Sequence, residues 1–151
     1  MAIINQLMPC SSHDPATLTA FDGVIDQYLR YSTQTLSTLE GIQANDPTFA
    51  LGHLFRGYQL KMASDPRFSQ PLEQSLQAAE QTAGNAREQA HVAALKAWQR
   101  NDTNKTSAIL GEILAADPTD LIALKAANHL HFYRGDAHAM LGAIQNSLPH
   151  W

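Results

Sequence analysis

The chain has 151 residues, of which 44% are hydrophobic, and this length and composition suit one globular domain with its own core. Ten lysines and arginines against 14 aspartates and glutamates give a net charge of −4, with both signs scattered along the sequence. Binding to nucleic acid requires a basic face, which this pattern does not provide, so we expect no nucleic-acid partner.

The first residues lack the features of a secretory signal. No Lys or Arg lies near the start, no long apolar stretch follows, and Pro9 directly precedes Cys10. No run in the chain approaches the roughly 18 apolar residues of a membrane span. We therefore expect a cytoplasmic protein with no membrane partner, in which residues 1–13 form an extended N-terminal arm.

Apolar residues recur at helical spacing almost continuously from residue 15, and β signals are nearly absent. Each connection is only a few residues long, so successive helices are expected to pack as antiparallel neighbours. The stripes predict eight short helices around residues 18–28, 36–42, 51–62, 72–79, 90–98, 110–114, 121–124 and 140–148.

Prolines and turn residues separate these stripes. An Asp-Pro pair predicts a helix start, because Asp is a good N-cap and proline suits the first helical turn. The prolines of the four pairs are Pro15, Pro47, Pro66 and Pro118. Turns at helix ends are predicted at Gly84-Asn85, Asn101-Asp102 and Gly135-Asp136.

The turn signals repeat at a fixed distance. The tripeptide Asp-Pro-Thr at positions 46–48 recurs at positions 117–119, and Ser64-Asp65 precedes Gly135-Asp136 by the same offset. Asn101-Asp102 precedes Gly135-Asp136 by about half of this offset, which falls within the periods typical of repeat proteins. Two landmarks at one offset predict a chain of repeated helical hairpins.

The segments 101–118 and 117–136 resemble the two halves of consecutive tetratricopeptide (TPR) units. Leu124, Ala127 and Asn128 stand where the consensus first helix has Trp, Leu and Gly, whereas Gly57 matches it. The resemblance implies an all-α fold, an α-α superhelix of about four antiparallel hairpins over residues 14–148. Prolines within residues 64–75 suggest an insertion there.

Nearly the whole chain resembles one TPR-containing family, the tetratricopeptide repeat protein 38 family. The resemblance is carried by Ser11-Ser12 and by segments 20–60, 88–102 and 124–140. It implies a helical-repeat protein of unassigned biochemical role. Family members generally continue past the point where this sequence stops, which implies a fragment or a naturally truncated version.

Two histidine patterns bear on metal binding. Glu88 and His91 form a Glu-x-x-His step, the spacing found in carboxylate-bridged di-iron bundles, but that chemistry needs a second such step, which is missing. His129 and His131 lie about 200° apart around a helix, so they cannot share an ion. We predict neither a metal nor another cofactor.

The sequence offers no catalytic constellation. Cys10 and His13 lie close in the arm, but a catalytic pair also needs an orienting group and an oxyanion hole. A Gly-x-Ser-x-Gly motif and a Gly-rich phosphate loop are both missing from the sequence. We predict that the protein is not an enzyme.

In a TPR superhelix the first helix of each pair lines a concave groove. Aromatic and hydrogen-bonding side chains in such a groove suit an extended peptide or a partner's helix. The alternative is that Tyr58, Trp98 and Phe132 pack against neighbouring helices. The predicted groove residues are Leu54, Tyr58, Lys61, Glu88, His91, Leu95, Trp98, Lys125, His129 and Phe132.

These patterns predict a non-catalytic interaction or scaffold module that binds a protein or peptide in the groove. Two alternatives stay open. One is part of a longer enzyme or small-ligand-binding protein whose pocket is completed beyond residue 151. The other is a self-associating fragment, a homo-oligomer formed through the last helix, which ends at Leu148 with no polar capping helix after it.

Overall fold

The computed structural model describes residues 10–12 and 14–151. This part of the chain is all-helical and confirms the prediction of eight α-helices. The helices are α2 (Pro15–Leu29), α3 (Thr35–Asn45), α4 (Ala50–Met62), α5 (Ser69–Thr82), α6 (Ala86–Gln99), α7 (Thr103–Ala116), α8 (Leu121–Tyr133) and α9 (Ala137–Ser147). Two short 3-10 helices are η1 (Pro66–Phe68) and η2 (Leu148–His150).

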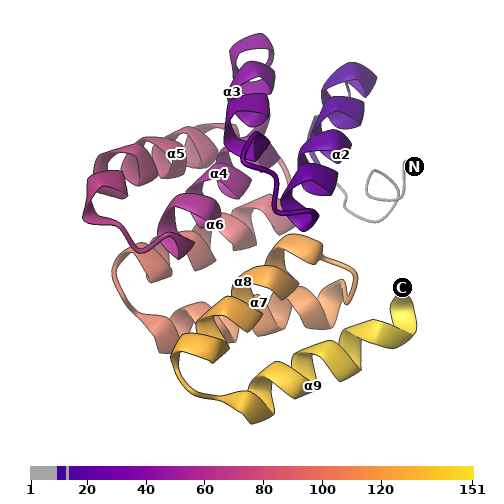
Figure 1. The fold of residues 1–151 in the computed structure, drawn as a ribbon, viewed down its shortest axis with the longest axis vertical. Coiled ribbons are helices and arrows are strands. Elements are labelled where there is room, and N and C mark those ends of the chain that lie inside the picture. Colours follow the sequence, from indigo (N-terminus) through magenta and orange to yellow (C-terminus); the bar gives the residue numbers. More distant parts are fainter. Residues whose placement is uncertain (1–9, 13) are drawn as a thin grey trace.

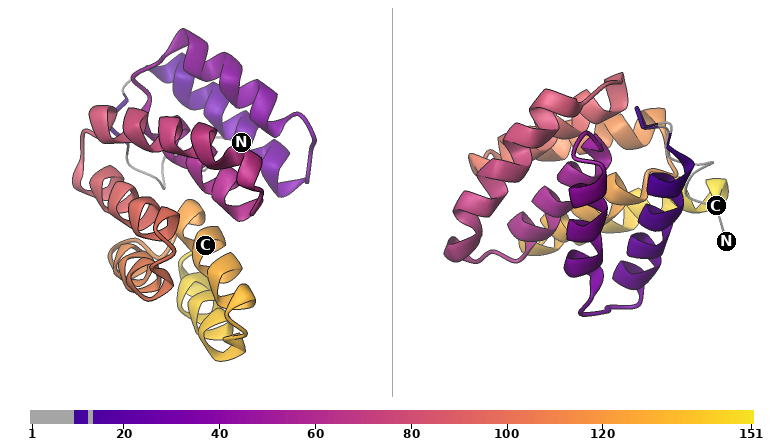
Figure 2. Two further views of the ribbon diagram at one scale, coloured as in Figure 1. Left: turned by 90° about the vertical axis from the view of Figure 1, so that its left-hand side faces the viewer. Right: turned by 90° about the horizontal axis from the view of Figure 1, so that it is seen from above.

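Consecutive helices pair as hairpins, α2 with α3, α4 with α5, α6 with α7 and α8 with α9. The hairpins follow one another along the long axis of the molecule, with α9 at one end (Figure 1). Figure 2 shows the first two hairpins in one half of the molecule and the last two in the other. Helix α4 packs against both α5 and α6, and α8 contacts α4 as well as α7 and α9.

Each hairpin turn contains one residue in the left-handed conformation. These are Tyr31, Ser64, Asn101 and Gly135, with φ of 57°, 53°, 60° and 69°, and they recur at similar intervals along the chain. The turns predicted at Asn101 and Gly135 are confirmed. The longest interval, from Ser64 to Asn101, contains η1, which accounts for the insertion expected near residues 64–75.

The Asp-Pro rule holds at two of its four positions. Asp14 caps α2 by accepting the main-chain N–H groups of residues 16 and 17, and Asp65 caps η1. At Pro47 and Pro118 the prediction is wrong, because α4 begins only at Ala50 and α8 only at Leu121.

The two failures have the same cause. The main-chain N–H and the hydroxyl of Thr119 both donate to Asp117 Oδ1, at 3.0 and 2.7 Å, and Thr48 makes the same pair of bonds to Asp46 Oδ1 at 3.2 and 2.8 Å. The aspartate therefore closes a turn at the end of the preceding helix. The next helix then needs its own cap, which Asp120 supplies for α8.

An apolar core runs through the hairpins. Phe21 of α2 meets Phe49 and Phe55 edge to face, with ring centroids 5.1 and 5.7 Å apart. Gly57 lets α4 approach α6, because a Cβ at this position would lie 2.5 Å from Leu95 Cδ2. Close packing of this kind leaves little space between the first helices of successive hairpins.

The longest helix has 15 residues, and within the described ranges no helix combines the length and apolar character needed to cross a bilayer. Residues 1–9 and 13 of the predicted arm lie outside the described residues. Cys10–Ser12 are non-helical and lie beside the start of α6, where Ser11 bonds Glu88.

Candidate functional site

Most of the predicted groove residues belong to the interior. Six of the ten have at most 6% of their surface exposed, so the prediction that they line an open groove is wrong. Their side chains pack between helices, which is the alternative considered for Tyr58 and Trp98. The six are Leu54, Tyr58, Glu88, His91, Leu95 and Trp98.

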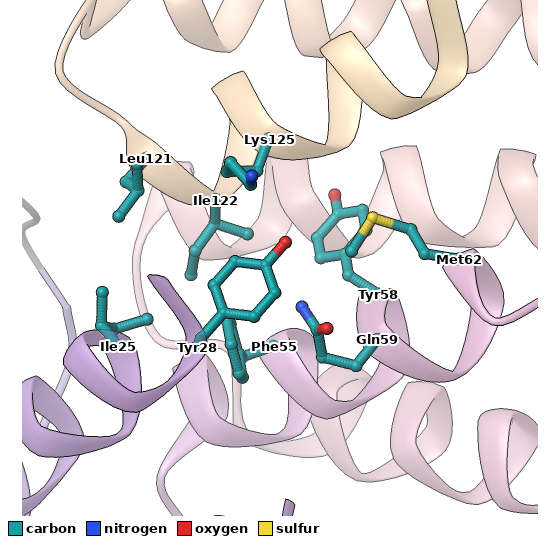
Figure 3. A pocket seen from close by; sticks show the side chains of 9 residues that line it. All are labelled: Ile25, Tyr28, Phe55, Tyr58, Gln59, Met62, Leu121, Ile122 and Lys125. Carbon is teal, nitrogen blue, oxygen red and sulfur yellow. The ribbon is translucent and has the colours of Figure 1, made fainter. Parts of the chain in front are cut away.

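The expected groove is closed because α8 lies directly against α4. Figure 3 shows side chains of α2, α4 and the start of α8 converging on the remaining space. That cavity has a volume of about 10 Å³, which is room for a single water molecule. A peptide or a helix cannot enter it.

The other four predicted residues are partly or fully exposed, but they form no common site. Lys61 donates to Asn101 Oδ1 at 2.9 Å, and the Lys125 ammonium lies 5.4 Å from the centroid of the Tyr28 ring. His129 contacts the Trp98 ring at one side and the Tyr133 ring at the other. Phe132 is 65% exposed.

Behind the closed groove, buried polar side chains from three hairpins meet in what we call the buried cluster: Tyr58, Arg87, His91 and Asp120. Asp120 Oδ2 accepts from Arg87 Nε at 2.6 Å and from His91 Nε2 at 2.9 Å. The Tyr58 hydroxyl lies 3.0 Å from His91 Nδ1. The side chains of His91 and Asp120 are fully buried, and that of Arg87 is 12% exposed.

Local structure places each group. Asp120 is the N-cap of α8, and its Oδ1 accepts the main-chain N–H of Ala123 at 2.9 Å. Arg87 and His91 are four residues apart, so they share one face of α6. Tyr58 reaches the same point from α4 and pairs edge to face with the His91 ring.

Electrostatics fixes the protonation of two members. Burial alone would raise the pKa of Asp120, but the charges and hydrogen bonds of His91 and Arg87 outweigh it and hold this pKa well below its usual range. Burial, together with the Asp120 charge, raises the pKa of Tyr58, so the phenol keeps its proton. His91 Nε2 then donates to the carboxylate. The Tyr58 hydroxyl shares a hydrogen bond with His91 Nδ1 and also donates to the His91 main-chain carbonyl oxygen at 3.3 Å.

Glu88 is also fully buried, but it faces the N-terminal arm instead of the cluster. Its Oε1 accepts the main-chain N–H of Ser11 at 2.8 Å, and its Oε2 accepts that of Gly84 at 2.8 Å. Its own N–H donates to Asn85, the N-cap of α6, which makes a variant of the capping box. The α6 dipole stabilises this carboxylate.

The Glu-x-x-His step thus serves two separate partners. Glu88 binds the arm, and His91 binds Asp120. In residues 10–12 and 14–151 no three metal-ligating side chains gather. Burial raises the pKa of the Cys10 thiol, which opposes formation of the nucleophilic thiolate. The sequence-based pairing of Cys10 with His13 lies outside the described residues.

Asp120 and Arg87 were not among the predicted site residues. Asp120 carried a usable signal, because an aspartate directly before an apolar helical run is an N-cap candidate. The prediction placed the start of this helix at the preceding Asp117-Pro118 pair, so Asp120 was not considered as its N-cap. Arg87 gave no signal of its own, since nothing local shows that it lies beside a carboxylate 33 residues away.

A different surface remains exposed near the C-terminal end. Leu141, Ile144 and Leu148 follow one another at helical spacing along α9 and the start of η2, and Ser147 is the only buried residue described in α9. Most of the large hydrophobic side chains that the described residues expose lie between positions 132 and 151. They are Phe132, Tyr133, Leu141, Ile144, Leu148 and Trp151.

No protein-family model and no solved structure matches this chain. The resemblance to the tetratricopeptide repeat protein 38 family therefore stays a prediction.

Proposed function

We propose that this protein is a non-catalytic interaction module that binds an amphipathic helix of a partner protein along α9. The observation that carries the proposal is the α9 stripe: Leu141, Ile144 and Leu148, which are 56%, 43% and 67% exposed. Large apolar side chains that lie next to one another on a protein surface mark interaction sites. An amphipathic helix is the natural partner for an apolar stripe at helical spacing.

A hollow opens on another side of α9, where Ala143 and the buried Ser147 lie. It lies between α7, α8 and α9, has a volume of about 190 Å³, and its lining includes Leu114, Ala127 and Ala143. No lysine, arginine, aspartate or glutamate lines it. Its lining also includes the polar side chains of Ser107, His131 and Asn146, and none of the three stripe residues.

The repeat spacing supports the finer assignment of the fold as a TPR-like superhelix of four hairpins. In such an array each hairpin contacts its neighbours, so an exposed apolar face on a helix suits packing by a further helix. A partner helix on α9 would extend the stack.

Site-specific photo-crosslinking in cells of the source organism tests the proposal. The crosslinker replaces Leu141 in one variant and Tyr31, which is 86% exposed on the first hairpin, in the control variant. We expect Leu141 to capture one defined segment with apolar residues at helical spacing. Identical products at both positions would refute the proposal.

A second variant separates binding from folding. Ile144→Asp places a charge in the stripe at an exposed position, so circular dichroism should show unchanged helicity while the Leu141 crosslink disappears. Leu36→Asp, at a position 37% exposed in α3, is the matched control and should keep the crosslink.

A second copy of the chain is the competing partner for the α9 stripe. Sedimentation velocity at two protein concentrations distinguishes the cases. A dimer that dissociates on dilution and is lost in Ile144→Asp would assign the stripe to self-association and refute a separate partner. A monomer at both concentrations supports the proposal.

A further inference from the structure

We infer that residues Cys10–Ser12 form a detachable strap, locked onto the start of α6 by the buried carboxylate of Glu88. The inference is independent of the proposed binding surface on α9. It rests on three features of the docking place: the hydrogen bond that holds the strap, the fit against Gly84, and the shallow burial of the strap itself.

The lock is one charge-assisted hydrogen bond. Ser11 donates its main-chain N–H to Glu88 Oε1 at 2.8 Å, across 77 residues of sequence. The second oxygen of the same carboxylate accepts from Gly84, so the strap and the α5–α6 link share one acceptor. Bonds of this type are about twice as strong as neutral ones.

The fit depends on a missing side chain. A Cβ at Gly84 would lie 2.6 Å from Ser11 Cβ and 3.1 Å from Ser11 Oγ. Carbon atoms that share no bonded neighbour do not approach as closely as this. Any side chain at residue 84 would therefore displace Ser11 from its position beside α6. Glu88 and the buried cluster would not have to move.

The strap makes two further contacts: Cys10 packs against the edge of the apolar core, and the main-chain N–H of Asp14 donates to Ser12 Oγ at 3.4 Å. All three of its residues are only partly buried, and none belongs to a helix. The Cys10 thiol bonds within the strap, to the Ser12 carbonyl oxygen at 3.5 Å. A non-helical segment that is only partly buried opens at a lower free energy than the whole fold. Opening exposes Glu88 to water and frees the Cys10 thiol.

Cys10 is the only cysteine in the chain, so thiol labelling reports directly on the strap. We expect an aromatic disulfide reagent to label native Cys10 at least ~10-fold more slowly than the unfolded chain, with little dependence on low urea concentrations. Gly84→Ala should speed labelling at least ~10-fold. Gly111→Ala, where an added Cβ meets nothing within 4 Å, should leave the rate unchanged.

A substitution in the strap itself tests the hydrogen bond without changing a residue of the apolar core. Ser11→Pro removes the donated N–H and should label like Gly84→Ala, whereas Ser11→Ala keeps the N–H and should label like the wild type. Circular dichroism should show the same helicity in all four variants.

Three results would overturn the inference. Wild-type labelling as fast as in the unfolded chain would show that the strap is not docked. Wild-type rates in Gly84→Ala and Ser11→Pro would show that the proposed lock does not hold it. A wild-type rate that follows global unfolding in urea would show that the strap does not detach by itself.

Discussion

Asp120→Asn isolates the charge of the buried cluster, because it keeps the size and shape of the side chain. The carboxylate serves three donors: Arg87 Nε and His91 Nε2 at Oδ2, and the main-chain N–H of Ala123 at Oδ1. An asparagine has one oxygen for these three donors. Its NH2 group must face either the α8 N-terminus or the guanidinium, and both of these are donors.

The expected loss follows from the burial of the group. Asp120 is completely buried, and removing one partner of a buried ion pair costs about 3–5 kcal/mol. The lower end applies because the Arg87 side chain is 12% exposed and can turn partly toward water. We expect Asp120→Asn to lower the free energy of unfolding by about 3 kcal/mol, a large part of the about 5–15 kcal/mol typical of a domain.

Asp102→Asn is the matched control. Asp102 caps α7 in the same way, accepting the main-chain N–H of Lys105 at 3.1 Å, but it is exposed and does not join the cluster. Asn caps a helix as well as Asp, so this variant should change stability by less than about 0.5 kcal/mol. Urea unfolding followed by circular dichroism at pH 7 measures both. A difference between the two variants of less than about 1 kcal/mol would refute the charge argument.

The stability difference between the wild type and Asp120→Asn should depend on pH. The pKa of Asp120 is lowered in the folded state, so the unfolded chain binds more protons in the acid range and stability falls with falling pH. This contribution is complete above the ordinary aspartate pKa of about 4 and is lost as the pH falls toward the lowered value. Asp120→Asn lacks this contribution, so the stability gap to the wild type should narrow as the pH falls below about 4.

Two further substitutions test the packing around the cluster. Tyr58→Phe should cost about 1–2 kcal/mol in urea unfolding, because the hydroxyl's hydrogen bonds to His91 Nδ1 and to the His91 carbonyl oxygen are lost while the ring stays in place. Gly57→Ala should cost about 1–3 kcal/mol, because its Cβ would lie 2.5 Å from Leu95 Cδ2 in the core. Gly23→Ala, where the new Cβ meets nothing within 4 Å, should stabilise the protein by about 0.5–1 kcal/mol, and equal effects at the two glycines would contradict the packing argument.

Local signals were sufficient to predict the eight helices and two of the four hairpin turns. Apolar spacing indicated eight stripes, and the residues chosen as turn signals at 101 and 135 do adopt the left-handed conformation. Such features depend on a few neighbouring residues, so they can be predicted from a single sequence. The errors at Pro47 and Pro118 arose because Asp-Pro-Thr can close a turn as readily as it can start a helix.

The arrangement of the helices could not be predicted in the same way. Whether Tyr58 or Leu95 lines a groove or fills a core depends on how tightly successive hairpins curve, and curvature sums small rotations at each interface. Here α8 comes close enough to α4 to close the space between them. The contact between Ser11 and Glu88 spans 77 residues, and no local pattern in either segment indicates the other.

The buried cluster specifies how the helices align with one another, which the apolar stripes alone do not. Hydrophobic burial has no direction, so rows of leucine and alanine side chains specify the register of neighbouring helices only through the fit of their shapes. Tyr58, His91 and Asp120 come from three successive hairpins or the link between them, and their hydrogen bonds form in only one stacking arrangement. Replacing the whole cluster by well-packed apolar residues would remove the desolvation cost of its charges and keep the eight helices. It would also remove the directional contact among α4, α6 and α8 that fixes how the hairpins close on one another.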